Sequence, residues 1–594
     1  MKKTDMPTEW DLTLLYKSLT DPAIERDQRK ADAAVASFAK RYRKDSRYLR
    51  NAKALADALL AYESLMSLPS AQALQYASFK KILNVADKEA EALSARLEAR
   101  ATKRGNQLLF FPLALGKISR AQQKAFLASP VLASYRYWLS QLFENAKYNL
   151  TEAEEKILSL KSDVSHGRWI QATSNIVNKH TVSFEGEVLP LPKAQAMVRT
   201  LPTPKRRELY GKLRAIYQDV ADIAESEINA VYSNKKIEDE LRGMKHPYES
   251  TVRGYQNDPK TILSLVDTVA AHNDIAHRFF KVKRTLLGEK QLVYADQAAA
   301  VGSLRTKMPF ADAVKLVREV FGELDPAYAD IFDRLLARGQ VDVYPKKGKE
   351  GGAFCASGIG MPTFVLLNHI DDFESLKTLA HEMGHAVHAE RTKTQRPIYQ
   401  GHPISTAETA STFFETAALH RLIERLPKEE QIIALHDTLQ DDMGSVFRQV
   451  ACFRFEQDLH AEVRKEGYVP KERIAALMQK HMQAYLGPAV TVDEADGYIF
   501  TYWSHIRYFF YVYSYAYGQL ISKSLYRRVV EDPAYIKKVD GFLSAGEHKS
   551  PRDIFASCGL NTVKPEVFQA GLDQIAENVA RLERLVSGDR KGKK

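Results

Sequence analysis

Apolar residues recur every three or four positions along most of the chain, which is the period of an amphipathic α-helix. Asp21-Pro22 opens one such stretch, with an apolar stripe from Ala23 to Lys40, and Asn51 to Met66 forms a second. Leu68-Pro69-Ser70 interrupts the pattern before a third predicted helix from Ala71 to Arg104. Long neighbouring helices of this kind favour a helical-hairpin layer. A coiled-coil dimer arm is the alternative, although no seven-residue repeat is sustained.

Changes in this pattern divide the chain. An irregular arm comes first, with Trp10 and Leu12 among its candidate anchors. Thr151 opens a helix in the middle of the chain, and Thr181 to Leu189 alternate as a β-hairpin. Leu201-Pro202-Thr203-Pro204 is a boundary because two prolines block a continuing helix. The predicted regions are a helical-hairpin region at 1–104, a mixed region at 105–204, a long, mainly helical region at 205–585 and a basic tail at 586–594.

Two short extended segments precede the helix that contains the candidate metal-binding residues. Ala353–Cys355 and Thr363–Leu367 are the best strand candidates in the second half, and an exposed edge there can pair with a peptide backbone. From Phe373 to Val387 the apolar residues return to helical spacing. Asp371 is predicted to cap this helix, with Glu374 three residues later as in a capping box.

The helix contains the pattern His381-Glu382-x-x-His385. Four residues turn a helix by about 400°, so the two imidazoles project from one face and can hold the same metal ion. Imidazole nitrogens suit zinc, and Glu382 lies close enough on the helix to take a proton from a water molecule that zinc activates. The alternative is a pair of ordinary histidines on an amphipathic helix.

A catalytic zinc usually has three protein ligands, so a third is expected downstream. The metzincin pattern would need Gly at 388 and His at 391, where this chain has His388 and Arg391, and that class is excluded. Glu408 and Glu415 lie seven residues apart on one face of a predicted helix, and spacing leaves both open as ligands. Glu408 also fits a capping box with Ser405, which would make it a structural residue.

Composition is that of an ordinary globular protein, with 45% apolar and 10% aromatic residues. The three cysteines lie far apart in the sequence, which argues against a disulfide framework. The N-terminus lacks an apolar signal region, so we expect a cytoplasmic protein without a membrane span. The net charge of +11 suggests a surface patch that binds nucleic acid as one possible function. We favour a solvated helix face and tail, because no nucleic-acid-binding motif accompanies the charge.

Several motifs resemble the oligoendopeptidase F family, bacterial relatives of thimet oligopeptidase. The resemblance runs from residue 9 to about 520. It is carried by Glu9–Tyr16, Phe364–Asn368, His381-Glu382-Met383-Gly384-His385, Ala407–Glu415 and His505–Ala516. One departure is Met383, where relatives often have Phe or Leu, a change that conserves volume.

This resemblance implies a mainly α, two-lobed helical zincin of the gluzincin type, with a small β-sheet beside the active-site helix and a deep substrate channel. It makes 105–204 the oligopeptidase F N-terminal region and 205–585 the zinc peptidase domain. By the same resemblance one zinc is bound by His381, His385 and Glu408, Glu382 is the general base, and Glu415 becomes a neighbour of the ligands. Substrates would be short unstructured peptides cut at internal bonds.

Aromatic residues near the end of the chain match positions where the family places donors to the oxyanion of peptide hydrolysis. These are His505, Tyr511 and Tyr515, with Tyr508 a weaker match. Without the resemblance the cluster would be interpreted as an aromatic core stripe. The rival functions are a metallocarboxypeptidase of similar helical fold and a non-catalytic helical protein that binds peptide or nucleic acid. We expect peptide substrates and neither nucleic acid nor membrane as partners.

Overall fold

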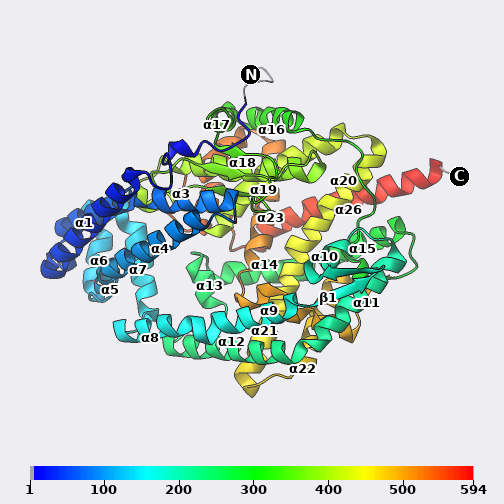
Figure 1. The fold of residues 1–594 in the computed structure, drawn as a ribbon, viewed down its shortest axis with the longest axis horizontal. Helices are drawn as coiled ribbons and strands as arrows, with labels where there is room; N and C mark the ends of the chain where they lie inside the picture. The colour runs from blue at the N-terminus through cyan, green and yellow to red at the C-terminus, as the bar shows by residue number, and fades with distance from the viewer. Residues whose placement is uncertain (1–5, 593–594) are drawn as a thin grey trace.

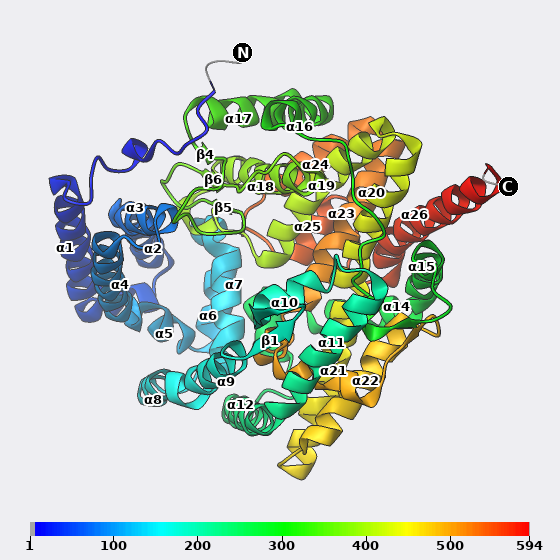
Figure 2. The same ribbon diagram turned by 45° about the vertical axis from the view of Figure 1, so that its right-hand side comes forward.

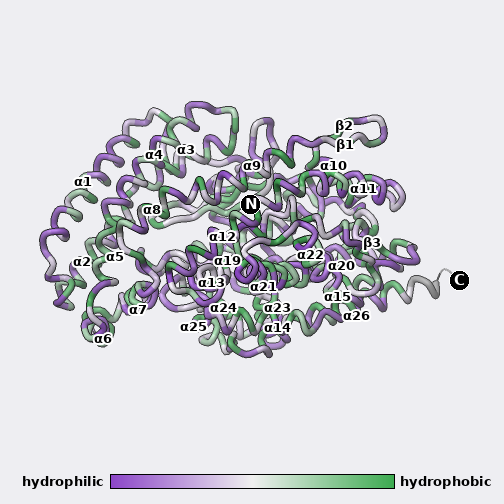
Figure 3. The backbone as a smooth tube through the Cα atoms, turned by 90° about the horizontal axis from the view of Figure 1, so that it is seen from below, coloured by the Kyte–Doolittle hydropathy of each residue, from purple (hydrophilic) through white to green (hydrophobic). Residues whose placement is uncertain are grey.

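The computed structural model describes residues 6–592, and 73% of the chain is helical against 3% in strands. This confirms the prediction of a mainly helical fold. The first seven helices gather at one end of the molecule, and the last helix leaves it at the opposite end (Figure 1). Hydrophobic and hydrophilic positions alternate along the helices, as expected for amphipathic segments (Figure 3). Within residues 6–592, no helix is both long and apolar enough to cross a membrane.

The N-terminal layer begins with the predicted helices. Its elements are α1 (Pro22–Lys44), α2 (Ala52–Met66), α3 (Ser70–Leu83), α4 (Lys88–Leu108), α5 (Phe110–Gly116), α6 (Arg120–Ala128) and α7 (Arg136–Asn145). The single helix predicted from Ala71 to Arg104 is wrong, because the chain breaks between Leu83 and Lys88. Asp87 caps α4 by accepting the N–H of Ala90, and neither proline nor glycine marks this break in the sequence.

Trp10 ties the irregular arm to the second half of the chain. Its indole Nε1 donates to the carbonyl of Val365 at 2.8 Å, and its backbone N–H donates to Asp342. The ring packs against Phe79 and Phe364. The arm and the first helices therefore share a hydrophobic cluster with the small sheet beside the active-site helix.

The middle of the chain holds a helix with a π-turn and the predicted hairpin. Its elements are α8 (Glu152–Ser162), the π-turn (Asp163–Gly167), α9 (Arg168–Asn178), β1 (Thr181–Phe184), β2 (Glu187–Pro190) and α10 (Leu191–Met197). Thr151 and Glu154 form the expected capping box at the start of α8. The strands β1 and β2 pair antiparallel, with Phe184 opposite Glu187. Both local predictions are confirmed.

The remaining helices surround the largest hydrophobic cluster. They are α11 (Thr203–Asp219), α12 (Ala221–Arg242), α13 (Glu249–Gly254), α14 (Pro259–Ala271), α15 (Asn273–Leu286), α16 (Phe310–Leu324), α17 (Pro326–Ala337), α18 (Phe373–Thr392), α19 (Ile404–Arg425), α20 (Lys428–Asp442), α21 (Arg448–Glu466), α22 (Lys471–Leu486), α23 (Tyr513–Glu531), α24 (Ile536–Leu543), α25 (Pro551–Ser557) and α26 (Pro565–Gly592). Most of the predicted basic tail continues α26, and 593–594 lie outside the described residues. The predicted division into domains stays a prediction.

A three-stranded sheet lies beside α18, as Figure 2 shows. Its strands are β4 (Val341–Asp342), β6 (Phe364–Leu366) and β5 (Phe354–Ala356), in the order β4-β6-β5. The strand β5 is antiparallel to β6 and forms an edge of the sheet. A second, parallel pair joins β3 (Leu292–Val293) to β7 (Val490–Thr491). The predicted strands and the predicted edge ahead of the active-site helix are therefore present.

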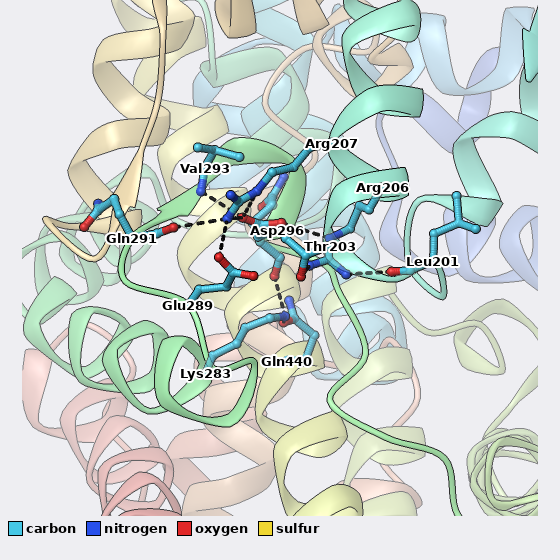
Figure 4. Close-up of polar contacts among 11 residues, drawn as sticks. Leu201, Thr203, Arg206, Arg207, Lys283, Glu289, Gln291, Val293, Asp296 and Gln440 are labelled. Atoms are coloured by element: carbon cyan, nitrogen blue, oxygen red, sulfur yellow. Dashed lines mark hydrogen bonds and ion pairs between the residues drawn. The ribbon is translucent and has the colours of Figure 1, made fainter.

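A buried ion group links three helices of the large cluster (Figure 4). Asp296 and Lys283 are both 0% exposed. Arg206 and Arg207, neighbours on α11, donate to the two oxygens of Asp296 at 2.9 and 2.7 Å. Lys283 on α15 donates to the carbonyl of Gln297 and to the side chain of Gln440 on α20. The group fixes α11, α15 and α20 against one another with directional contacts.

Candidate active site

The helices α18 and α19 carry the predicted metal ligands and pack very closely. A Cβ on Gly384 would lie 2.9 Å from the Cα of Ser411, so a glycine is required for this approach. The N-cap of α18 is Asp372, which accepts the N–H of Ser375 at 2.8 Å. The prediction that Asp371 caps the helix is wrong by one residue, since Asp371 itself adopts a positive φ of 59°.

Three predicted ligands come together where α18 faces α19. One ligand atom from each of His381, His385 and Glu408 lies within 4.8 Å of the others. Nε2 of His381 is 3.7 Å from a carboxylate oxygen of Glu408. Two imidazole nitrogens and a carboxylate oxygen are a donor set that fits zinc and leaves a fourth position open. The residues therefore fit a catalytic metal of this kind.

Glu415 lies beside the three predicted ligands, on the Nδ1 side of the His381 ring. Its carboxylate accepts a hydrogen bond from Nδ1 of His381 at 2.7 Å, which leaves Nε2 of the same ring facing Glu408. Glu408 is not a helix cap, because α19 starts after Pro403 without any side-chain cap. The two glutamates that spacing alone left open thus differ in geometry: Glu408 lies near Nε2 of His381, and Glu415 contacts Nδ1 of the same ring.

Glu382 lines a cavity of about 420 Å³ together with His381, Glu408 and Glu415. The side chain of Glu382 is 7% exposed. Burial raises its pKa to about 7, a rise that the charge of His381 opposes and the charge of Glu408 assists. A carboxylate with a pKa in this range exchanges protons readily near neutral pH.

The two histidines have opposite electrostatic settings. Burial lowers the pKa of His381, but the hydrogen bond to Glu415 and the nearby carboxylates outweigh it and raise this pKa to about 9. Burial and the neighbouring charge of His381 lower the pKa of His385 to about 3. Burial raises the pKa of Glu408. For Glu415, burial is outweighed by the bond with His381 and the charge of Lys377, which hold its pKa below the ordinary value.

The predicted oxyanion donors form one aromatic group. Tyr515 lies in the wall of the cavity. The ring of Tyr511 is 5.9 Å from that of Tyr515, and His505 stacks on Tyr511 at 5.5 Å. Tyr511 and Tyr515 do not share a helix, because α23 begins only at Tyr513. Of the three, Tyr515 is the one that lines the cavity, and the other two lie beside it.

Some cavity residues were missed by the sequence reasoning. Lys377 lines the cavity one helical turn before His381, a spacing that could have revealed it. It pairs with Asp441, whose position at the end of α20 no local pattern predicts. Outside the cavity, His388 is buried and stacks on His402. Cys355 on β5 is half-buried, and the burial of its thiol raises the pKa.

A family model described as "Peptidase family M3" matches residues 203–574, well over half of the chain. The chain belongs to peptidase family M3. A second model, described as "Oligopeptidase F", matches residues 115–177 of this M3 peptidase. Together the two matches confirm the resemblance to the oligoendopeptidase F family and identify a metalloendopeptidase.

Relatives of this M3 peptidase extend over nearly all of its length. It is 24% identical to the group B oligopeptidase PepB of Streptococcus agalactiae over 530 residues, which covers 86% of this chain and 87% of the relative. A solved peptidase structure from Chlamydophila abortus superposes with a TM-score of 0.85 at 22% identity, covering 97% of this chain and 98% of the other. Oligoendopeptidase-F from Enterococcus faecium superposes with a TM-score of 0.68 at 18% identity, covering 94% and 99%. These structures share the fold of this chain.

Proposed function

We propose that this peptidase hydrolyses internal bonds of short, unstructured peptides with one zinc ion held by His381, His385 and Glu408. The observation that supports the proposal is the convergence of these three ligand atoms within 4.8 Å, beside the buried Glu382. When bound, zinc would polarise the peptide carbonyl and lower the pKa of water. The names of the relatives, an oligopeptidase and an oligoendopeptidase, agree with this class of substrate.

In this proposal Glu382 is the general base. It takes a proton from the attacking water molecule and passes it to the amine that leaves, for which a pKa of about 7 is well matched. Glu415 accepts the Nδ1 hydrogen of His381, so that Nε2 is the nitrogen directed toward Glu408, where zinc would displace its proton. Tyr515, assisted by Tyr511 and His505, donates hydrogen bonds to the developing oxyanion.

The route of the substrate follows from the edge strand. The strand β5 is an edge of the sheet packed beside α18, so an extended peptide can pair with it and place its carbonyl near Glu382. Backbone pairing accepts many side chains, whereas a folded protein has few extended segments free to bind. A cytoplasmic location and a deep channel between two lobes stay predictions.

Replacing Glu382 by Gln tests the base. We expect Glu382→Gln to lose at least about 10³-fold in kcat, because the amide cannot accept the proton, while zinc stays near one per chain. Metal content by mass spectrometry and hydrolysis of a fluorogenic peptide give the two readouts. Normal turnover in this variant would refute the assignment.

A test peptide that is blocked at both ends distinguishes the proposed function from its rivals. An endopeptidase cuts such a peptide internally, whereas a metallocarboxypeptidase needs a free carboxylate and leaves it intact. A non-catalytic binding protein would neither cut it nor hold stoichiometric zinc. Mass spectrometry of the products identifies the endopeptidase, and the zinc content separates the other two functions, with a chelator-treated sample as the control.

A further inference from the structure

Two consecutive aromatic residues near the site adopt a backbone conformation that side chains disfavour. Phe509 and Phe510 have φ values of 49° and 64°, in the left-handed region. Neither residue is a glycine, so the conformation costs free energy and must be imposed by the surroundings. The strained turn lies in the segment 505–511, which also carries His505 and Tyr511.

A buried carboxyl group holds this turn. Glu456 on α21 is 0% exposed, and its Oε1 accepts the backbone N–H of Phe510 at 2.8 Å. In the described part of the chain, its other oxygen has no hydrogen-bond partner and no cation pairs with it. Burial raises the pKa of Glu456 to about 8, and the bond from Phe510 opposes the rise. Burying a carboxyl group without a cation costs free energy. The hydrogen bond from the Phe510 N–H offsets part of this cost.

Other contacts fix the segment on both sides of the strained turn. The hydroxyl of Tyr232 donates to the carbonyl of Ile506 at 3.0 Å, and Thr251 donates to the carbonyl of Phe509 at 2.8 Å. The ring of His460, one turn after Glu456 on α21, stacks on Phe510 at 5.0 Å. Burial is the main cause of the raised pKa of Tyr511, followed by the contact with Tyr515, and the charge of Glu456 makes a smaller contribution.

We propose that Glu456 is a positioning residue for peptide hydrolysis: by accepting the Phe510 N–H it holds the strained turn and so fixes His505 and Tyr511 beside Tyr515. The proposal rests on the proposed function, in which these three side chains stabilise the oxyanion. Glu456 does not touch the substrate. Its loss should therefore lower kcat while leaving KM nearly unchanged, because the donors act in the transition state.

The experiment compares Glu456→Leu with Glu456→Gln in two readouts. Leu removes the acceptor, so amide hydrogen exchange in the segment 505–511 should rise at least about tenfold, and kcat should fall about 10²-fold with KM within about twofold. Gln keeps a carbonyl oxygen for the Phe510 amide, so exchange and kcat should stay within about threefold of the unmodified protein. Should Glu456→Leu fail to fold, Glu456→Met, with an unbranched side chain of similar length, replaces it.

Glu63→Leu is the matched control for the loss of a buried carboxylate. Glu63 is 4% exposed, accepts the N–H of Ile398 and pairs with Arg396. Ile398 belongs to another hydrophobic cluster, so exchange at 505–511 should not change. The proposal is overturned if Glu456→Leu leaves both exchange and kcat unchanged, or if Gln is as damaging as Leu. Absence of peptide hydrolysis by the unmodified protein would instead defeat the proposed function, and the exchange measurement would still decide the role of Glu456.

Discussion

The two ring nitrogens of His381 distinguish two glutamates that the sequence presents as equivalent. Nδ1 donates to Glu415, and Nε2 faces Glu408. Seven residues apart on α19, both carboxylates point to the same side, so helical spacing cannot separate a ligand from a residue that orients one. Their roles depend on where α18 crosses α19, which is a property of the packed structure.

The different positions predict different losses of metal. Glu408→Ala should lose stoichiometric zinc, because it removes one of the three ligand atoms. Glu415→Ala should weaken zinc binding by about 10–100-fold, as removal of a group that orients a ligand does. Metal content after dialysis against a series of chelator concentrations measures both effects. Glu424→Ala, an exposed position on the same helix, is the control, and the reverse order of the two losses would move the third ligand to Glu415.

Proton release accompanies zinc binding if His381 is a ligand. Its pKa is raised to about 9, so below that pH the ring carries a proton that metal binding must displace, whereas His385 with a pKa of about 3 is already neutral. Apparent zinc affinity should therefore rise by about tenfold per pH unit from neutral pH to about 9 and then level off. Calorimetric titration in two buffers of different ionisation enthalpy counts the released proton.

The raised pKa of His381 also makes the stability of the metal-free protein depend on pH. A raised histidine pKa stabilises the fold below the ordinary value of 6.5, and this contribution is lost as pH rises through about 9. Glu415→Gln removes the carboxylate that raises the pKa, so it should release less than one proton on zinc binding at about pH 7.5. Zinc binding without any proton release in the unmodified protein would contradict the assignment of His381.

At the scale of elements, the site depends on how closely three helices approach. Gly384 lets α18 approach α19, and a Cβ on Gly518 of α23 would lie 3.0 Å from the Cβ of Glu408. Glycines thus permit the close packing of α18, α19 and α23, the three helices that hold the predicted ligands and Tyr515. A single added methyl group changes the distance between helices and with it the geometry of the ligands.

Gly384→Ala should separate α18 from α19. The new Cβ meets the backbone of Ser411, which cannot move without moving Glu408 one turn earlier on the same helix. We expect a loss of about 1–3 kcal/mol in the free energy of unfolding and at least tenfold weaker zinc binding. Urea unfolding and competition with a chelator measure the two effects. Gly444→Ala, where a Cβ meets nothing within 4 Å, is the control, and unchanged zinc affinity in Gly384→Ala would show that the helices tolerate the methyl group.

The sequence predicts elements where the information is local. Caps, prolines and hydrophobic period predict α1, α2, α8, α18 and the β1–β2 hairpin, because each depends on neighbours within a few residues. The break between Leu83 and Lys88 is missed, since Val85 there donates to Gly348, far away in the chain. The segment 505–511 is missed for the same reason: helical spacing suggests one face for Tyr511 and Tyr515, but Glu456 and Thr251 hold the chain in a turn.

For the candidate site, the motif predicts two ligands and the base, and the resemblance supplies Glu408. Lys377 and Asp441 escape the sequence reasoning because their pairing joins α18 to the end of α20. Tyr515, rather than Tyr511, lies in the cavity wall, a difference that depends on where α23 begins. Local patterns therefore predict which residues do chemistry better than they predict which residues surround them.

At the scale of the whole molecule, buried charges hold distant segments together. The group around Asp296 joins α11 to α15 and α20, and its carboxylate has two arginines and a backbone N–H as donors. No residue of this group lines the cavity at His381. Its contribution is expected in the stability of the fold, separately from the chemistry of the site.

Asp296→Asn should destabilise the fold without disabling the site. Removing one partner of a buried ion pair leaves Arg206, which is 2% exposed, without its counter-charge, and costs about 3–5 kcal/mol. Urea unfolding followed by circular dichroism measures this, and zinc content and kcat of the folded fraction should stay within about twofold. Asp219→Asn, an exposed residue at the end of α11, is the control; equal stability of the two variants would show that the buried group contributes little.

The contact of Trp10 with Val365 has a consequence for the order in which the chain matures. During synthesis the indole emerges from the ribosome long before its acceptor on β6 exists. The arm cannot find its place until the sheet has been made, and the site must wait further for Tyr515. A chain released prematurely keeps this indole uncovered, so incomplete copies expose an apolar surface that finished copies bury.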